Sequence, residues 1–475
     1  MERDHHQIRK GKLETWKKKG INPYGTRFLP LVPLQDIREN FSRYEKKTVR
    51  VAGRIMSIRE HGKSTFMDIQ GEEARLQLYF KIDVVGEENY RNLSYLDRGD
   101  IIGAEGEVFK TRTGEITLLV KKYHLLTKCL HPIPQEWFGL RDVEKRYRQR
   151  YLDLIINQKV RENFFLRSKV ISLIRRFLEN RGFKEVETPM MHVIPGGALA
   201  EPFTTHHSAL DLTLYLRIAP ELYLKRLVVG GMEKIFEINR CFRNEGVSSR
   251  HNPEFTMLEL YWAYADYRDL MELTEELFKY ILENTRGSLT LNYQGKELDF
   301  TPPWERITFS EALRRFAGVD WKNEKEVKKK AEELGEKENS LRKMIDSIFK
   351  KAVLPRISQP TFIHDYPVLL SPLAKRKNEE LTERFQPVVA GLEIGNAYSE
   401  LNDPEEQKER FLSQQEERKK GEKDAHPWDK DFIEALEYGM PPTAGLGLGI
   451  DRIIMLLTDS PTIREVIFFP LLKPS

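Results

Sequence analysis

The sequence predicts an α+β protein: a small β-barrel near the amino end, followed by a larger domain in which helices flank an antiparallel sheet. The chain has 475 residues, more than one hydrophobic core usually holds. Between residues 47 and 127 apolar and polar residues alternate with the period of two that strands show. Beyond residue 159 the apolar spacing becomes helical, so a domain boundary is expected between the two parts.

Composition sets the broad class of protein. Apolar residues make up 40% and charged residues 32% of the chain, which is typical of a water-soluble globular protein. There is no run of about eighteen apolar residues and no apolar signal core at the amino end. We therefore expect no membrane association and a cytoplasmic location. Cys129 and Cys241 lie far apart without a Cys-x-x-Cys companion, which supports neither a disulfide framework nor a zinc site.

The amino-terminal domain, residues 1–140, is predicted to hold a helix and then a five-stranded barrel. Leu76, Leu78 and Phe80 alternate with Arg75 and Gln77, as in a strand with one buried face. Five strands within about eighty residues favour an oligonucleotide-binding (OB) fold. The strands are predicted at residues 48–58, 64–69, 75–80, 101–108 and 115–126.

A break at Pro132-Ile133-Pro134 ends this domain, and residues 141–158 are predicted as a basic linker. The net charge of the whole chain is only +4, but lysines and arginines concentrate in residues 1–24 and 141–150. Both stretches flank a predicted nucleic-acid module. We therefore expect them to contact phosphates.

Residues 159–475 are predicted to form the second domain. One helix is indicated by an apolar stripe that ends at Gly182, and a strand over residues 183–188 follows it. Two further strands, residues 232–243 and 254–261, are joined by a polar loop. The charged residues 323–350 are interpreted as a solvated insertion and residues 404–424 as a surface helix. The glycines at 445, 447 and 449 are predicted to open a helix that runs through Leu457.

Five runs of residues carry a resemblance to a known family. They are Ala219-Pro220-Glu221-Leu222-Tyr223-Leu224-Lys225-Arg226, Phe242-Arg243-Asn244-Glu245, Arg250-His251-Asn252-Pro253-Glu254-Phe255, Glu393-Ile394-Gly395-Asn396-Ala397-Tyr398-Ser399-Glu400-Leu401-Asn402-Asp403 and Gly445-Leu446-Gly447-Leu448-Gly449-Ile450-Asp451-Arg452. In this order they resemble the class II aminoacyl-tRNA synthetases, subclass IIb, and within these the lysyl-tRNA synthetases. The resemblance places motif 1 at about residues 164–189, motif 2 at about 232–261 and motif 3 at about 443–457. It implies a catalytic domain on an antiparallel sheet and a homodimer through motif 1.

The resemblance implies that ATP activates an amino acid. A carboxylate oxygen attacks the α-phosphorus and pyrophosphate leaves, so the protein has to align two anions and offset their repulsion. Arginines suit this task because a planar guanidinium bridges two oxyanions. By resemblance the catalytic pair is Arg243 and Arg452, and the ATP contacts are Arg243, Glu245, Arg250, His251, Asn252, Phe255 and Arg452.

The same resemblance implies that the amino acid is lysine. Burying an ammonium group is costly unless carboxylates meet it, and three glutamates stand at positions of the family's amino-acid pocket. An aspartate enzyme would need cationic residues there. The implied lysine-binding residues are Gly197, Glu221, Arg243, Glu259, Tyr261, Asn396, Tyr398 and Glu400.

Magnesium is the implied cofactor, since it bridges phosphate oxygens of the substrate ATP. Glu393 matches one metal-binding acid of the family. At the partner position, seven residues earlier, the family has glutamate and this chain has Gln386. An amide oxygen coordinates Mg²⁺ without contributing charge, so the number of ions stays open.

In the barrel, Arg59, Phe66 and Gln77 fall where related synthetases hold the tRNA anticodon. Exposed aromatic side chains stack on bases, and amides read the edges of bases. Taken alone, Phe66 is better explained as part of the barrel core.

We therefore expect ATP-dependent ligation of L-lysine to tRNA(Lys) through a lysyl-adenylate. One alternative is a catalytically altered relative that binds tRNA or lysine as a regulator, which Gln386 favours and the pair Arg243 and Arg452 opposes. A second is an aspartate- or asparagine-type synthetase, which the acidic pocket disfavours. A third, attachment of lysine to a protein, is disfavoured by the complete barrel.

Overall fold

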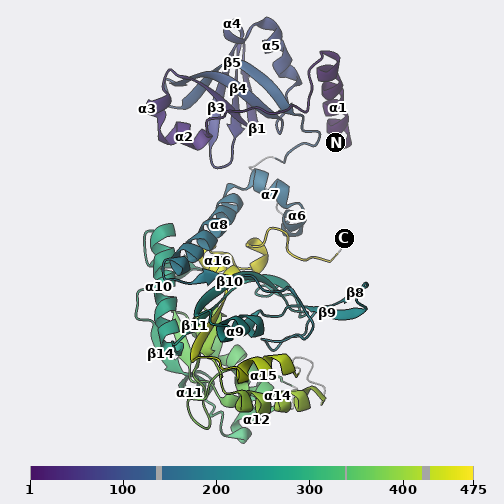
Figure 1. Cartoon of the computed structure of the whole chain (residues 1–475). Coiled ribbons are helices and arrows are strands. Elements are labelled where there is room, and N and C mark those ends of the chain that lie inside the picture. Colours follow the sequence, from purple (N-terminus) through teal and green to yellow (C-terminus); the bar gives the residue numbers. More distant parts are fainter. Residues whose placement is uncertain (1, 135–141, 337–339, 420–427, 474–475) are drawn as a thin grey trace. The chain divides into compact units, whose positions relative to one another are not determined.

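The computed structural model describes residues 2–134, 142–336, 340–419 and 428–473 (Figure 1). The chain divides into two compact units, residues 1–141 and 142–475. Arg141 of the predicted linker and residues 420–424 of the predicted surface helix lie outside the described residues. The α+β class is confirmed, with a five-stranded barrel in the first unit and a large sheet with helices in the second.

The first unit contains a closed barrel with the strand order β1-β2-β3-β5-β4. All five strands occur where the sequence predicts them, and Leu76, Leu78 and Phe80 are buried inside. The elements are α1 (Glu2–Lys18), α2 (Leu34–Glu39), α3 (Phe41–Tyr44), β1 (Thr48–His61), β2 (Ser64–Gln70), β3 (Arg75–Lys81), α4 (Ile82–Val85), α5 (Glu87–Asn92), β4 (Ile101–Lys110) and β5 (Ile116–Thr127).

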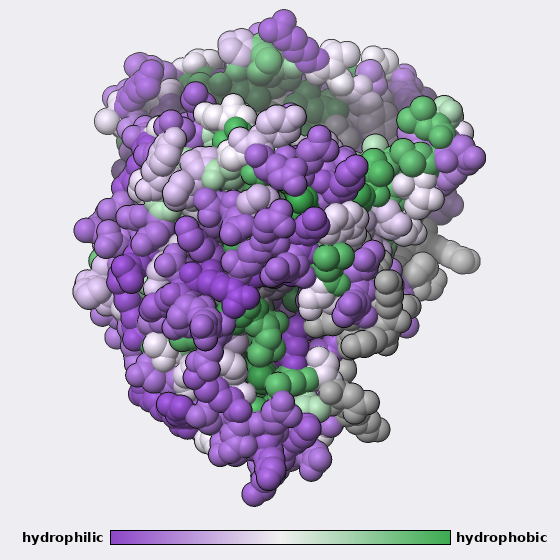
Figure 2. All heavy atoms as spheres, turned by 60° about the horizontal axis from the view of Figure 1, so that its bottom comes forward, coloured by the Kyte–Doolittle hydropathy of each residue, from purple (hydrophilic) through white to green (hydrophobic). Residues whose placement is uncertain are grey.

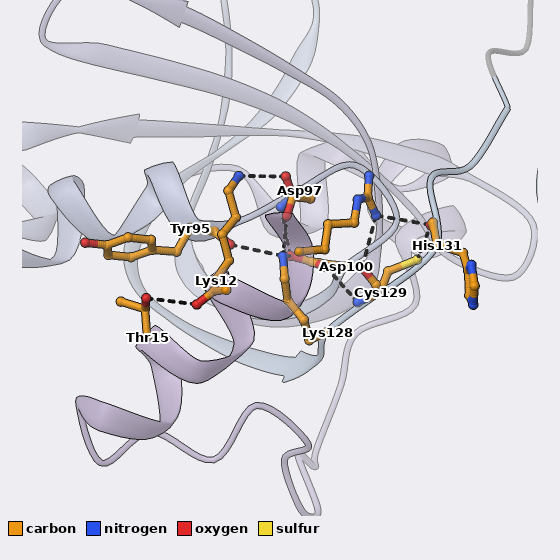
Figure 3. A network of polar contacts seen from close by, with 10 residues as sticks. Lys12, Thr15, Tyr95, Asp97, Asp100, Lys128, Cys129 and His131 are labelled. Atoms are coloured by element: carbon orange, nitrogen blue, oxygen red, sulfur yellow. Dashed lines mark hydrogen bonds and ion pairs between the residues drawn. The ribbon is translucent and has the colours of Figure 1, made fainter. Parts of the chain in front are cut away.

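Helix α1 is attached to the barrel by the polar network in Figure 3. The buried Lys128 pairs with Asp97 at 2.5 Å, and Lys12 of α1 reaches the other oxygen of the same carboxylate at 2.7 Å. Arg9, also of α1, donates to the carbonyl of Cys129 at 3.0 Å. Two of the basic residues that were expected to contact phosphates therefore hold α1 against the barrel.

The second unit is built on a nine-stranded sheet with the order β14-β15-β16-β18-β19-β11-β10-β6, and β17 pairs with β16. The strands are β6 (Lys184–Glu185), β10 (Lys234–Phe242), β11 (Glu254–Ala263), β14 (Glu305–Thr308), β15 (Thr361–His364), β16 (Arg384–Val389), β17 (Leu392–Glu393), β18 (Gly395–Ser399) and β19 (Thr443–Gly449). Most pairs are antiparallel, but β14 with β15 and β10 with β6 are parallel. The sheet is therefore mixed, because the long segments before β10 and β15 allow the crossovers that parallel neighbours need.

One face of this sheet is covered by three long helices, α8 (Gln158–Glu179), α10 (Tyr267–Thr285) and α16 (Ile450–Thr458). Leu258 and Leu260 of β11 point into the apolar core under these helices. Because successive side chains of a strand alternate between its faces, Glu259 and Tyr261 point to the other face. The opposite face of the sheet is thus polar, and it carries the cavity described below.

The glycine-rich run near the carboxyl end differs from its prediction. The glycines at 445, 447 and 449 lie in strand β19, and helix α16 begins only at Ile450. The prediction that they open a helix is wrong, because β19 is paired on both sides, with β11 and β18. The strand predicted at residues 183–188 is also shorter and covers only Lys184–Glu185.

Residues 142–158, predicted as a basic linker, form helices α6 (Val143–Arg148) and α7 (Arg150–Ile156). The Arg150 side chain is fully buried and pairs with Asp153 at 2.7 Å. Arg146 pairs with Asp153 at 3.0 Å and with Glu465 at 3.1 Å. These arginines fasten the segment to the second unit, and the expectation that Arg150 contacts phosphates is wrong.

The charged insertion is packed rather than solvated. It contains α12 (Glu324–Glu333) and α13 (Leu341–Ile348), and Met344, Ile345 and Ile348 of α13 are buried in a core that they share with Ile363 of β15 and Val388 of β16. The remaining elements of the second unit are β7 (Met191–His192), β8 (Thr204–His207), β9 (Leu212–Leu216), α9 (Glu221–Val229), β12 (Thr290–Tyr293), β13 (Lys296–Asp299), α11 (Phe309–Ala317), α14 (Pro404–Lys419) and α15 (Lys430–Glu437).

The face of the molecule in Figure 2 is mostly polar. Figure 2 shows hydrophilic residues over most of the face that lies at the bottom of Figure 1. Within the described residues no helix combines the length and the apolar character that crossing a membrane requires.

Candidate active site

A cavity of about 380 Å³ lies on the polar face of the large sheet. The structure brings to its wall all the residues that the sequence relates to ATP, lysine or metal. They are Gly197, Glu221, Arg243, Glu245, Arg250, His251, Asn252, Phe255, Glu259, Tyr261, Gln386, Glu393, Asn396, Tyr398, Glu400 and Arg452.

The glycines of β19 make room for this cavity. Gly445 lies opposite Tyr261 of β11 and Tyr398 of β18. A Cβ atom at Gly445 would collide with the carboxylate of Glu400 and would come within 2.7 Å of the Tyr261 ring. The residues that alternate with these glycines, such as Leu446, point toward the helices on the other face of the sheet. Glycine is needed here for space rather than for a helix start.

One end of the cavity is acidic and is compensated by a buried lysine. Glu221 Oε1 accepts hydrogen bonds from Tyr398 Oη at 2.6 Å and from Lys225 Nζ at 2.7 Å. Lys225 also pairs with Glu400, and its side chain has no exposed surface. Burial lowers the pKa of Lys225, but the two carboxylates outweigh burial and raise it. Lys225 therefore stays charged between the two glutamates.

Burial raises the pKa of Glu400 well above its usual value, although Lys225 opposes that shift. Glu259 differs from Glu221 and Glu400 in having a tyrosine instead of a lysine as its partner. Tyr261 Oη donates to Glu259 Oε2 at 3.2 Å. Burial, together with the charge of Glu221, raises the pKa of Glu259 to about 8. In the unliganded protein Glu259 thus holds a proton at neutral pH, and an arriving ammonium group favours its ionisation.

The other end of the cavity is lined by arginines. The Arg243 guanidinium lies 5.0 Å from the centre of the Phe255 ring, and Arg452 donates to the carbonyl of Glu393. Arg452 Nη2 is 3.1 Å from His251 Nε2. Burial, and then the charge of Arg452, lower the pKa of His251 to about 4. Neutral His251 therefore accepts a hydrogen bond from Arg452 and adds no charge.

The loop between β10 and β11 is held by its own polar residues. Arg250 Nη1 donates to the carbonyl of Gly391 at 3.1 Å. Asn252 is buried and its Nδ2 donates to the carbonyl of Glu254 at 2.6 Å. Glu245 is exposed on the same loop. These contacts orient the loop over the cavity.

Asp451 joins the three family motifs, a role that the sequence interpretation missed. Its Oδ1 pairs with Arg167 of α8 at 2.6 Å, and its Oδ2 accepts the backbone N–H of Thr256 at 2.7 Å. Arg167 also donates to the Thr256 hydroxyl at 2.9 Å. Arg452, the residue that follows Asp451, lines the cavity. The sequence signal was an acid in the first turn of the helix, directly before the predicted catalytic arginine.

Lys225, Asp346 and Lys350 were also missed. Lys225 follows Glu221 by four residues on α9, the spacing at which two side chains meet on a helix. Asp346 and Lys350 line the cavity from the segment interpreted as a solvated insertion. The apolar spacing of Met344, Ile345 and Ile348 was the available sign that this segment packs against something.

The metal-binding residues fit only part of a magnesium shell. Gln386 is 6% exposed, and its Oε1 already accepts the hydroxyl of Tyr366 at 2.6 Å. In the part of the chain that is described, no group of three or more His, Cys, Asp or Glu side chains is placed to hold a metal ion. The donor set fits an ion bound by Glu393, phosphate oxygens and water, and it does not fit an ion held by the protein alone.

The three anticodon candidates share the outer face of the barrel. Phe66 is half-buried and stacks on Tyr79 with ring centres 4.5 Å apart, while its neighbour Met67 points into the core. Arg59 is the cross-strand partner of Phe66, and Gln77 stands two residues before Tyr79 on the same face. The explanation of Phe66 as barrel core is therefore wrong.

Comparisons with known proteins agree with this geometry. Residues 142–473 match the model of the family "tRNA synthetases class II (D, K and N)", and residues 49–126 match "OB-fold nucleic acid binding domain". A lysine–tRNA ligase of Pelotomaculum thermopropionicum is 54% identical over 98% of this chain and 94% of its own length. The lysine–tRNA ligase of Thermoanaerobacter pseudethanolicus is 53% identical over 98% of this chain and 96% of its own length. That of Moorella thermoacetica is 52% identical over 100% of this chain and 98% of its own length.

The chain thus belongs to the class II aminoacyl-tRNA synthetases of the D, K and N group. Within that group its place is in the lysine–tRNA ligase family, given the identity over nearly the full length. The resemblance that the sequence motifs carry is confirmed.

The buried lysine yields a prediction on stability. Lys225→Met leaves Glu221 and Glu400 without their shared cation, so we expect the free energy of unfolding to fall by about 3–5 kcal/mol. Urea denaturation of both proteins measures the change. The double variant Lys225→Met/Glu400→Gln removes one of the two carboxylate charges and should recover part of the loss. An unchanged stability of the single variant would show that Lys225 does not compensate the pocket.

Proposed function

We propose that this chain ligates L-lysine to tRNA(Lys) through a lysyl-adenylate. The observation that carries the proposal is the division of one cavity into an acidic end and an arginine-lined end. Glu221, Glu259 and Glu400 supply carboxylates for the ammonium groups of lysine. Arg243 and Arg452 supply guanidinium groups for the anions that react.

In the first step a carboxylate oxygen of lysine forms a bond to the α-phosphorus of ATP. The bond from that phosphorus to the oxygen bridging to the β-phosphate breaks, and pyrophosphate leaves with the electron pair. Arg243 orients the carboxylate and the α-phosphate, and Arg452 holds the β- and γ-phosphates. In the second step a ribose hydroxyl of the terminal adenosine of tRNA attacks the carbonyl carbon. AMP leaves, and lysine is joined to tRNA by an ester bond.

Magnesium belongs to this proposal as the cofactor. Glu393 would bind the ion together with phosphate oxygens and water, and the ion would supply positive charge to the triphosphate. Gln386 contributes no charge. A cytoplasmic location also stays a prediction.

The alternatives are disfavoured by particular residues. An aspartate-type enzyme would place a cation against its substrate side chain, but Lys225, the cation beside the acidic end, is already paired with Glu221 and Glu400. A regulator without catalysis would not require Arg243 and Arg452 to line the same cavity as the acidic pocket.

Amino-acid-dependent exchange of pyrophosphate into ATP tests the reaction. We expect lysine to support exchange and aspartate and asparagine to support none. Arg243→Ala should lower the exchange rate roughly a hundred- to thousandfold, because it removes a charge-assisted contact made in the transition state. Exchange with aspartate, or no exchange with any amino acid, would contradict the proposal. A variant within threefold of the wild type would contradict the role of Arg243.

We also propose that Arg59, Phe66 and Gln77 contact the anticodon. Phe66→Ala should lower the catalytic efficiency of tRNA charging about fivefold to more than a hundredfold, which corresponds to about 1–3 kcal/mol for one stacked base. Lysine-dependent pyrophosphate exchange should be unchanged, because the cavity residues all belong to the second unit. The control is Tyr24→Ala, which removes an exposed aromatic residue of the first unit that lies outside the five strands, and it should leave both charging and exchange unchanged. Equal losses in charging and exchange would show that Phe66 is structural.

A homodimer through motif 1 is the last part of the proposal. Met190, Met191 and Val193 follow the motif 1 helix and are each about half exposed. They form an apolar stretch that the described part of the chain leaves open to solvent. Val193→Glu should shift the protein from dimer to monomer in analytical ultracentrifugation, because it places a charge in the interface. Leu412→Glu on α14 is the control and should leave the mass unchanged. A monomeric wild type would contradict the dimer.

A further inference from the structure

Lys350 lines the arginine end of the cavity. It follows α13, in a π-helical turn at Phe349–Val353, a kind of turn that often occurs at functional sites. Phe349 and Val353 are buried and anchor the turn, while the Lys350 side chain keeps 58% of its surface exposed and lines the cavity. The packing of its neighbours therefore fixes where this ammonium group stands.

The adjacent Lys351 has a different environment. It pairs with Glu336 and does not line the cavity. The two neighbouring lysines thus have the same charge and similar exposure, 58% and 50% of the side chain, but only Lys350 faces the substrate site.

The known partner of Lys350 does not account for its position. Its Nζ pairs with Asp346 Oδ2 at 2.7 Å, one turn earlier on the helix. An exposed pair of this spacing contributes little to stability and needs no cavity. Burial acts to lower the pKa of Lys350, but Asp346 and then Glu393 and Glu245 raise it. The ammonium group is therefore charged, and it stands in the field of the metal-binding candidate Glu393.

Gln386, which lines the same cavity, contributes no negative charge to the binding of a metal ion. The resemblance of the sequence implies a glutamate at this position, whereas the amide of Gln386 is neutral, nearly buried, and bound to the Tyr366 hydroxyl. A carboxylate at 386 would attract a divalent ion. A lysine facing the cavity has the opposite effect, since it repels cations and attracts phosphate oxygens.

We propose that Lys350 binds the β- or γ-phosphate of ATP and supplies there the positive charge that a second divalent ion would otherwise bring. Gln386 and Lys350 then form one arrangement: the loss of a carboxylate removes a metal ligand, and a fixed ammonium group replaces the ion. The inference rests on the proposed use of ATP, and it assigns Lys350 as a further phosphate-binding residue.

Binding of ATP without any metal tests Lys350 directly. Isothermal titration calorimetry in EDTA compares the wild type with Lys350→Met, Lys350→Arg and the matched control Lys351→Met. We expect Lys350→Met to weaken ATP binding about tenfold, as for the loss of one charge-assisted contact. Lys350→Arg should retain most of the affinity, and Lys351→Met should stay within twofold of the wild type. Equal affinities of Lys350→Met and Lys351→Met would overturn the proposal.

The second part of the proposal concerns the number of ions. Electron paramagnetic resonance of Mn²⁺ counts the ions bound per site in the presence of a non-hydrolysable ATP analogue. We expect the double variant Lys350→Met/Gln386→Glu to bind one ion more than the wild type, because a carboxylate has replaced an amide and the competing ammonium group is gone. Equal numbers would overturn this part.

These outcomes are separable from a failure of the proposed function. A protein that binds ATP in EDTA but exchanges no pyrophosphate with lysine would contradict the ligase reaction and still report on Lys350. Thermal unfolding of each variant shows whether it is folded, and Lys350→Arg keeps the comparison valid if the methionine variant unfolds.

Discussion

Compensation of buried charge is the constraint on which the active site depends. Three glutamates, from α9, from β11 and from the end of β18, line one cavity, and repulsion among them would oppose folding if all were ionised and alone. The structure reduces this repulsion in two ways: Lys225 pairs with Glu221 and Glu400, and Glu259 keeps its proton. With all three ionised, one ammonium group leaves two negative charges, which is the number that the two ammonium groups of lysine would neutralise. This count of charges supports the proposal that the pocket binds a substrate with two ammonium groups.

The site lies on the polar face of the sheet because successive side chains of each strand alternate between the two faces. Leu258 and Leu260 of β11 have to be buried under the helices, and this requirement alone places Glu259 and Tyr261 in the cavity. Asp451 then links that strand to the helix layer through Arg167 and fixes the start of α16. Arg452 follows Asp451 directly, so the buried ion pair between Asp451 and Arg167 determines where a predicted catalytic guanidinium stands.

Much of the fold and of the site could be predicted from the sequence, because local patterns of residues indicate them. The barrel strands follow from alternation in residues 47–127, and family motifs located the residues that the structure gathers around one cavity. The partners of these residues were less accessible. Lys225 looked like an ordinary helix lysine, and only the fold shows that Glu400, distant in sequence, meets it. Arg150 looked like a phosphate ligand, because charge is visible in a sequence and burial is not. The glycines of β19 suggested a helix start, although their reason is the space that the Glu400 carboxylate and the Tyr261 ring occupy.

Each end of the cavity has a lysine ammonium group that offsets negative charge, but one lysine is buried and the other is half exposed. At the acidic end Lys225 is fully enclosed, so its ammonium group is permanently paired and its role is independent of any ligand. At the arginine end Lys350 retains 58% exposure and only one close partner among the described contacts, Asp346. A half-exposed ammonium group has already lost part of its hydration, so it gives up less when a phosphate arrives than a fully exposed one would, and it is already oriented by the packed turn around it. A side chain held in this way contributes charge without the loss of translational freedom that binding a free ion entails. Replacing an ion by Lys350 therefore lowers the entropy cost of binding ATP.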